Sequence, residues 1–172
     1  MMESYRELRA RLDAKFEEIR REHPKQFACQ LGCHSCCKPG LTVNAIEKEE
    51  IRIFLREHPE IVARLKDVSK GNPHQGKRCS MLDAQGQCLI YEVRPFVCRS
   101  HGAPLQFRPL DAGENQRARD SCPLNFSSLS LAEIPANFVI NLDTLNTLLA
   151  LLCERGFPGD RSRTSLNIRI LD

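Results

Sequence analysis

The sequence predicts a small, mainly α-helical protein whose helices surround an irregular, loop-rich centre. Apolar residues recur at helical spacing near both ends of the chain, over residues 3–22 and 137–155. Between these two segments lie eight of the nine cysteines, together with many glycine and proline turn signals. We therefore expect little regular sheet beyond one short hairpin.

The length of 172 residues predicts a single domain, 1–172, that is large enough for a hydrophobic core. Its expected parts are an N-terminal helix over 1–26, a cysteine-cluster core over 27–125 and a C-terminal helical region over 126–172. No secretory signal is visible, and the longest apolar run, near residues 148–153, is too short to cross a bilayer. We expect a cytoplasmic protein without membrane association, in which thiols stay reduced.

The first expected helix, over residues 3–22, combines one apolar stripe with a face of glutamate and arginine, and Pro24 ends it. The stripe consists of Leu8, Leu12, Phe16 and Ile19. Charges of both signs suit a solvated surface better than a basic nucleic-acid patch, so nucleic-acid binding is disfavoured.

A second helix is expected to start at Asn44, which forms a capping box with Glu47, and to run to His58. Pro59 suits the first turn of a third, short helix. Residues 70–77 are polar and contain glycine and proline, so they are expected to form a loop.

Residues 79–91 are expected to form a hairpin or tight loop that turns at residues 84–86 and carries Cys79 and Cys88 on its two arms. Next come a short helical turn over 91–99, an exposed polar excursion over 108–120 and the start of a helix over 130–133.

The strongest helical pattern of the second half covers residues 137–155, with Gly156 at the position that often ends a helix. Its apolar face consists of Phe138, Leu142, Leu145, Leu148, Leu149 and Leu152. Cys153 lies on this helix and is expected to be a core thiol. The tail, 165–171, is compatible with a strand, a helical turn or an extended end.

The cysteines outside that helix cluster in polar, glycine-containing loops, which burial alone does not explain. Thiols gathered in this way either form disulfides or bind metal, and an odd count in a reducing compartment favours metal. Cys33 and Cys36 have the short spacing that lets two thiolates converge on one ion, and Cys37 follows directly. Because adjacent side chains usually diverge, we expect Cys36 and Cys37 to reach different ions or opposite sides of one cluster.

Further thiolates are available from Cys79, Cys88, Cys98 and Cys122. With Cys29, these cysteines supply eight thiolates, enough for two four-ligand sites or for one larger cluster with spare thiolates. Zinc and iron–sulfur centres both accept four thiolates, so the number of cysteines does not distinguish zinc from iron. Eight thiolates and two divalent ions would change the formal charge of +3 to about −1, so the basic balance is weak support for a nucleic-acid partner.

Arg94 and Arg99 flank Cys98, and we expect their charges to lower the pKa values of nearby thiols and to donate hydrogen bonds to sulfur. His34 and His101 lie close to cysteines in the sequence. Because enough sulfur ligands are present, both histidines are expected to be exposed or to lie beside the metal site rather than to ligate.

The blocks 33–37, 78–82 and 86–99 resemble the CxxCxxCC family of YkgJ-like cysteine-cluster proteins, described as zinc- or iron-chelating domains and as Fe–S-cluster-containing proteins. The resemblance covers roughly residues 27–125 and implies that the cysteines of this segment bind the metal. The implied ligands are Cys29, Cys33, Cys36, Cys37, Cys79, Cys88, Cys98 and Cys122. Cys29 departs from the pattern, because three residues separate it from Cys33 where the family name has two.

Many sulfur ligands and few catalytic groups favour a carrier, sensor or accessory factor that binds zinc or iron and is not an enzyme. Its expected partners are the metal ion or cluster and a further protein. An alternative is a redox or group-transfer enzyme with an iron–sulfur cluster, and no catalytic residue is assigned for it. Its candidate substrate or proton-transfer residues are Tyr91, Glu92, Arg94 and His101. A structural zinc module for nucleic acid or protein is a third hypothesis, disfavoured by the lack of a basic stripe.

Overall fold

A computed structural model describes residues 1–30, 32–71, 77–113 and 116–171 and confirms the mainly α-helical fold class. The α-helices among these residues are α1 (Met2–Glu22), α2 (Ala45–Glu57), α3 (Pro59–Gly71), α4 (Phe96–Ser100) and α5 (Leu142–Gly156). Short 3₁₀ helices are η1 (Pro24–Gln26), η2 (Tyr91–Val93), η3 (Leu131–Glu133), η4 (Ala136–Phe138) and η5 (Ile168–Leu171).

The chain divides into two compact units, each assembled from segments that are distant in the sequence. The first unit combines Glu3–Cys29 with Phe96–Leu152, and the second combines Gln30–Pro95 with Cys153–Asp172. The single domain expected over 1–172 stays a prediction, because each unit is described by itself.

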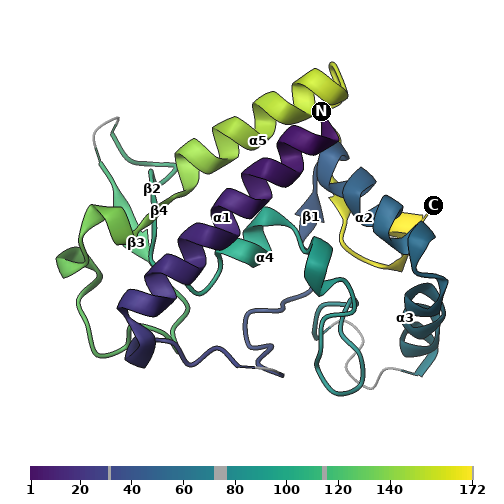
Figure 1. Ribbon diagram of the computed structural model, residues 1–172, viewed down its shortest axis with the longest axis horizontal. Coiled ribbons are helices and arrows are strands. Elements are labelled where there is room, and N and C mark those ends of the chain that lie inside the picture. Colours follow the sequence, from purple (N-terminus) through teal and green to yellow (C-terminus); the bar gives the residue numbers. More distant parts are fainter. Residues whose placement is uncertain (31, 72–76, 114–115, 172) are drawn as a thin grey trace. The chain divides into compact units, whose positions relative to one another are not determined.

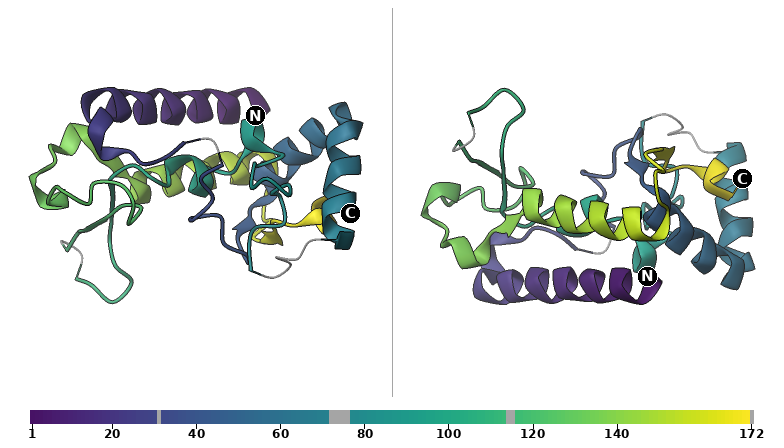
Figure 2. Two further views of the ribbon diagram at one scale, coloured as in Figure 1. Left: turned by 90° about the horizontal axis from the view of Figure 1, so that it is seen from below. Right: turned by 90° about the horizontal axis from the view of Figure 1, so that it is seen from above.

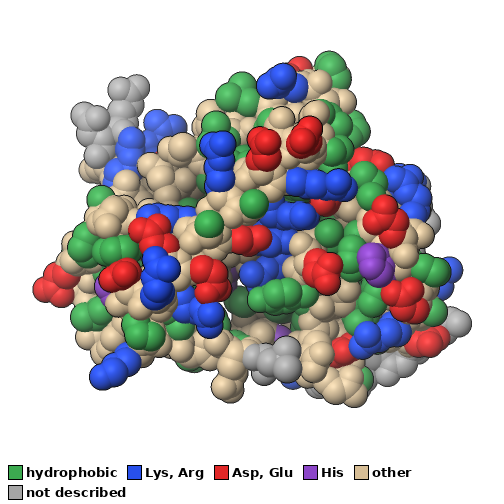
Figure 3. All heavy atoms as spheres, in the orientation of Figure 1, with side chains coloured by type: hydrophobic (Ala, Val, Ile, Leu, Met, Phe, Trp, Pro, Cys, Tyr) green, Lys and Arg blue, Asp and Glu red, His purple; other side chains and the backbone are tan. Residues whose placement is uncertain are grey.

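In the first unit, α1 confirms the first predicted helix, and its residues Leu12 and Ile19 are buried. The short helix α4 packs against α1 (Figure 1), where the rings of Tyr5 and Phe96 lie 5.4 Å apart between centroids. The solvent side of α1 carries ion pairs such as Lys15–Glu18. Together with the Arg20–Glu17 pair, this confirms the mixed surface expected for the helix. Figure 3 shows that acidic and basic side chains also stand among one another on this face of the molecule.

A three-stranded sheet in the first unit corrects the expectations of an entirely irregular excursion over 108–120 and of a helix that starts at residue 137. Its central strand β2 (Leu105–Phe107) pairs antiparallel with β3 (Ala118–Asp120) and parallel with β4 (Ile140–Asn141). The polar excursion therefore ends in a strand. Residues 108–113, which follow β2, extend away from the rest of the unit in both views of Figure 2. The expected helix over 137–155 begins later, at Leu142, because the preceding residues form η4 and β4.

Helix α5 has a narrower buried face than the sequence predicts. Leu145 and Leu149 are buried, whereas Leu148 is exposed. Cys153, near the end of the helix, is buried as expected for a core thiol. Its exclusion from metal binding stays a prediction.

In the second unit, the capping box of α2 is confirmed, because the Asn44 side chain accepts from the backbone N–H of Glu47 and the Glu47 carboxylate accepts from that of Asn44. Helix α3 begins at Pro59 as predicted and extends to Gly71, so the first residues of the expected 70–77 loop are helical. Residues 72–76 of that loop lie outside the described residues.

The tail forms a strand followed by a 3₁₀ helix. Strand β5 (Thr164–Ser165) pairs antiparallel with β1 (Thr42–Val43), and η5 follows it. Ile170 of η5 is fully buried, as are Ile46 and Ile51 of α2. The chain end therefore contributes to the core of the second unit. Of the helices in the described segments, none is both long enough and apolar enough to span a membrane.

Candidate metal centre

Three of the predicted ligands, Cys33, Cys36 and Cys37, share one short loop of the second unit. Two turns shape this loop: the N–H of Cys33 donates to the carbonyl of Gln30, and the N–H of Cys37 donates to the carbonyl of His34, both at 2.9 Å. All nine cysteines fall within the described residues and are free thiols.

The thiols of Cys36 and Cys37 are hydrogen-bonded to each other. In this structure the two side chains therefore lie close to each other, and their binding to different ions or to opposite sides of one cluster stays a prediction. This contact raises the pKa of the Cys36 thiol, burial raises the pKa further, and the charge of Arg94 opposes both. Two soft donors thus lie side by side, and a cation that binds there would displace the protons.

Residues 79–91 form the predicted hairpin-like turn and bring Cys79 and Cys88 to this loop. The N–H of Cys79 donates to the carbonyl of Cys37 at 2.9 Å, which ties the two cysteine-bearing segments together. Cys88 forms an isolated antiparallel bridge with Leu82. Burial raises the pKa of the Cys88 thiol to about 11, with a smaller contribution from the charge of Cys79, and burial also raises the pKa of Cys79.

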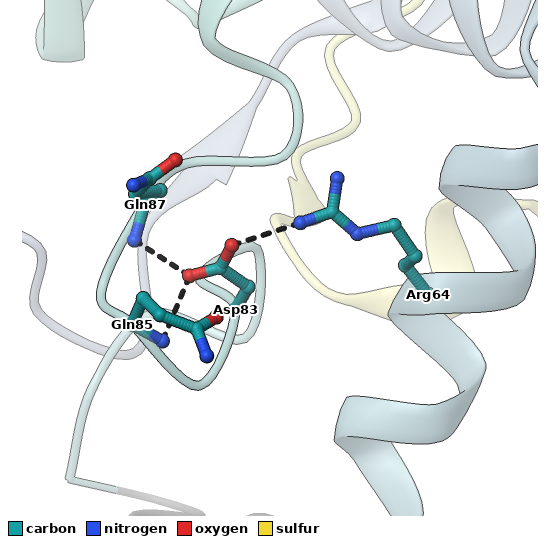
Figure 4. Close-up of polar contacts among 4 residues, drawn as sticks. All are labelled: Arg64, Asp83, Gln85 and Gln87. Carbon is teal, nitrogen blue, oxygen red and sulfur yellow. Dashed lines mark hydrogen bonds and ion pairs between the residues drawn. The ribbon is translucent and has the colours of Figure 1, made fainter.

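Asp83 organises the turn between these two cysteines (Figure 4). Its Oδ1 accepts from the backbone N–H of Gln85 at 3.0 Å and from that of Gln87 at 2.8 Å, while its Oδ2 pairs with Arg64 of α3 at 2.9 Å. The carboxylate therefore shapes the turn and anchors it to a helix. The turn is predicted by its residues 84–86, whereas the role of Asp83 depends on Arg64 of another element.

Gly86 lies in the same turn and touches His34 of the cysteine loop. Its φ is +79°, and a Cβ at this position would overlap the His34 ring. His34 thus packs against the hairpin, in agreement with a place beside the metal site. Its exclusion from the ligands stays a prediction.

We expect Asp83→Ala to lower the free energy of unfolding of the metal-free protein by about 1–3 kcal/mol, because two backbone donors lose their acceptor. Urea unfolding followed by circular dichroism measures this change. Glu49→Ala is the matched control, since Glu49 forms an ion pair of the same length, 2.9 Å, with Arg56 within α2. The control should change stability by less than about 1 kcal/mol. Equal effects of the two substitutions would contradict the organising role of Asp83.

The other predicted ligands, Cys29, Cys98 and Cys122, belong to the first unit. Cys122 is buried and its carbonyl accepts from the N–H of Asn125 at 2.8 Å. The Asn125 side chain reaches the sulfur of Cys29 at 3.2 Å. Cys29 is an exposed residue, and Cys98 is half-buried on α4.

Arg94 and Arg99, expected to act together, have different surroundings. Arg94 of the second unit stacks over the Tyr91 ring at 4.1 Å, and its charge lowers the pKa values of Cys36 and Cys88 against the larger effects named above. Arg99 of the first unit is buried and binds Asp13 of α1 through both carboxylate oxygens, at 2.7 and 2.8 Å. The geometry therefore supports the expected effect on sulfur for Arg94, whereas Arg99 joins α4 to α1.

An open cavity of about 240 Å³ in the second unit has Cys88 in its wall. Polar side chains from the end of α2, from the hairpin and from η2 also line it, among them His58, Asp83, Tyr91 and Glu92. A small molecule that enters this cavity would thus meet one of the proposed ligands.

The donor set fits a thiophilic cation in its chemistry. Over the described segments, no three His, Cys, Asp or Glu side chains converge closely enough to hold a metal ion as they stand. The second unit instead supplies two pairs of neighbouring thiols, Cys36 with Cys37 and Cys79 with Cys88, on segments joined by a backbone hydrogen bond. Thiolates are the donors that zinc and iron–sulfur centres use.

Comparison with known proteins identifies one family. The model of the CxxCxxCC family, described as a "putative zinc- or iron-chelating domain", matches residues 28–123, more than half of the chain. This segment contains all eight cysteines predicted as ligands. No curated protein and no solved structure matches the chain.

Proposed function

Because this chain belongs to the CxxCxxCC family of zinc- or iron-chelating domains, we propose that it binds zinc or iron through thiolates and acts as a carrier, sensor or accessory protein without catalysis of its own. The observation that carries this proposal is the junction between Cys37 and Cys79. The 2.9 Å backbone hydrogen bond there joins the loop that carries Cys36 and Cys37 to the hairpin that carries Cys79 and Cys88, about 40 residues later in the sequence.

The proposed ligands in the second unit are five cysteines, namely Cys33, Cys36, Cys37, Cys79 and Cys88. Those in the first unit are Cys29, Cys98 and Cys122. A bound zinc or iron would supply a positive centre that keeps these sulfurs as thiolates and holds their loops in place. Coordination by thiolates alone usually leaves no open position for a substrate, which favours a binding role over a catalytic one. Ligands of this kind need reduced thiols, as in the cytoplasm.

Purification under anaerobic conditions, followed by metal analysis and visible absorption, tests this proposal. We expect stoichiometric zinc in a colourless protein, or iron in a coloured one, with at least one metal ion per chain. A reduced, folded protein that contains neither metal and takes up neither zinc(II) nor iron(II) would overturn the proposal.

The cavity beside Cys88 favours one second candidate, a redox or group-transfer enzyme with an iron–sulfur cluster. Tyr91 and Glu92 line this cavity and are the residues that would contact a substrate. This candidate requires iron together with acid-labile sulfide in the purified protein. Stoichiometric zinc without sulfide would exclude it and leave the binding role in place.

A further inference from the structure

Asn125 of the first unit lies outside the segment that the family model matches, and only 2 % of its surface is exposed. Three groups from two distant segments surround its side-chain amide. Oδ1 accepts from the N–H of Ala28 at 2.9 Å, and Nδ2 lies 2.7 Å from the carbonyl oxygen of Gly102 and 3.2 Å from Sγ of Cys29. The buried side chain of Asn125 therefore forms hydrogen bonds with Cys29 and with backbone groups of Ala28 and Gly102.

The two backbone partners settle which way this amide points. The N–H of Ala28 can only donate, so it requires the oxygen of Asn125, and the carbonyl of Gly102 can only accept, so it requires the NH₂ group. The second N–H of that group is then directed to Cys29, whose sulfur lies nearer to Nδ2, at 3.2 Å, than to Oδ1, at 3.7 Å. In the shorter of these two contacts the sulfur of Cys29 accepts from Nδ2, and in the longer one its thiol can donate to Oδ1.

Gly102 makes room for this arrangement. Its φ of +108° lies in a region that favours glycine, and a Cβ at this position would lie 3.2 Å from Nδ2 of Asn125 and 3.4 Å from Sγ of Cys29. The absence of a side chain lets the carbonyl of Gly102 and the sulfur approach the same amide group.

A hydrogen bond to an anionic sulfur is stronger than one to a neutral thiol, and such bonds orient the ligands of metal centres. We propose that Asn125 is a positioning residue that holds Cys29 as a metal-binding thiolate. Cys29 is the predicted ligand whose spacing departs from the family pattern. Its hydrogen bond to the buried amide of Asn125 fixes the position of its sulfur. This inference rests on the proposed metal-binding function.

A double-mutant cycle on the full-length protein tests this inference, with zinc(II) affinity measured by competition with a chromophoric chelator. Removing an outer hydrogen bond to a metal ligand typically weakens metal binding about 10–100-fold. We expect Asn125→Ala to weaken zinc binding by about 10-fold in the wild-type background. In the Cys29→Ser background, the same substitution should change the affinity less than about twofold, because the group on which Asn125 acts is gone. Equal effects in both backgrounds would make Asn125 a purely structural residue and overturn the inference.

A spectroscopic measurement separates positioning from stability. With cobalt(II) in place of zinc, each thiolate ligand contributes to the sulfur-to-cobalt charge-transfer absorption. We expect Asn125→Ala to lose the same share of this absorption as Cys29→Ser, and an unchanged spectrum would contradict the inference. If Asn125→Ala does not fold, Asn125→Asp supplies the same comparison, since it retains the oxygen that accepts from Ala28 and lacks the NH₂ donors.

Failure of this inference differs from failure of the proposed function. Wild-type protein that binds neither zinc(II) nor cobalt(II) would overturn the metal-binding function itself. Equal zinc affinity of the wild type and Cys29→Ser would leave that function intact and show that Cys29 is not a ligand, which overturns the role of Asn125.

Discussion

Replacing Cys37 with serine is expected to remove most of the bound zinc or iron and to lower the stability of the metal-loaded protein by several kcal/mol. Cys37 is hydrogen-bonded to Cys36 through its thiol and to Cys79 through its carbonyl, so it lies where the two cysteine-bearing segments meet. Structural zinc sites have apparent binding free energies of about 10–16 kcal/mol, and this binding free energy contributes to folding. Metal analysis and thermal unfolding of the variant measure both effects.

Cys153→Ser is the control for this experiment. Its thiol is also buried, but it lies on α5 outside the cysteine loops. Burying a hydroxyl there should cost stability without loss of metal. A Cys37→Ser protein with wild-type metal content, or a Cys153→Ser protein without metal, would show that the thiols have been assigned incorrectly.

Gly86→Ala is expected to have the second-largest effect, on both stability and metal affinity. An alanine there adopts a left-handed conformation, which costs about 1–2 kcal/mol, and its Cβ overlaps the His34 ring, for which overpacking adds about 1–3 kcal/mol. The turn must shift to relieve this overlap, and Cys88, two residues later, shifts with it. Urea unfolding of the metal-free protein and chelator competition measure the two consequences.

Two comparisons isolate the contact with His34. Gly40 has a φ of +83° and no atom within 4 Å of its hypothetical Cβ, so Gly40→Ala incurs only the conformational cost. In a His34→Ala background, Gly86→Ala should also lose only that smaller amount. The packing of His34 against the turn would be refuted if Gly86→Ala and Gly40→Ala were equally destabilising.

Features set by neighbouring residues could be predicted from the sequence. The capping box of Asn44 and Glu47, the start of α3 at Pro59 and the turn at 84–86 all depend on residues within a few positions of each other, and all are confirmed.

Features set by distant partners could not be predicted. Strand β4 forms by parallel pairing with β2, about 35 residues earlier in the sequence. Because the residues of β4 are extended, α5 begins only at Leu142. The place of Asn125 beside Cys29 likewise depends on a contact across 96 residues, which no local pattern encodes. Asp83 is an intermediate case, since aspartate at the start of a turn is a recognised signal, whereas its partner Arg64 lies on another element.

X-ray absorption at the metal edge of the protein as isolated anaerobically tests the central claim most directly, because it reports the atoms bound to the ion. Thiolate coordination predicts a shell of sulfur neighbours, at about 2.3 Å for zinc. A shell made only of nitrogen and oxygen at about 2.0–2.2 Å would contradict the claim, since the metal would then be held by groups other than these cysteines.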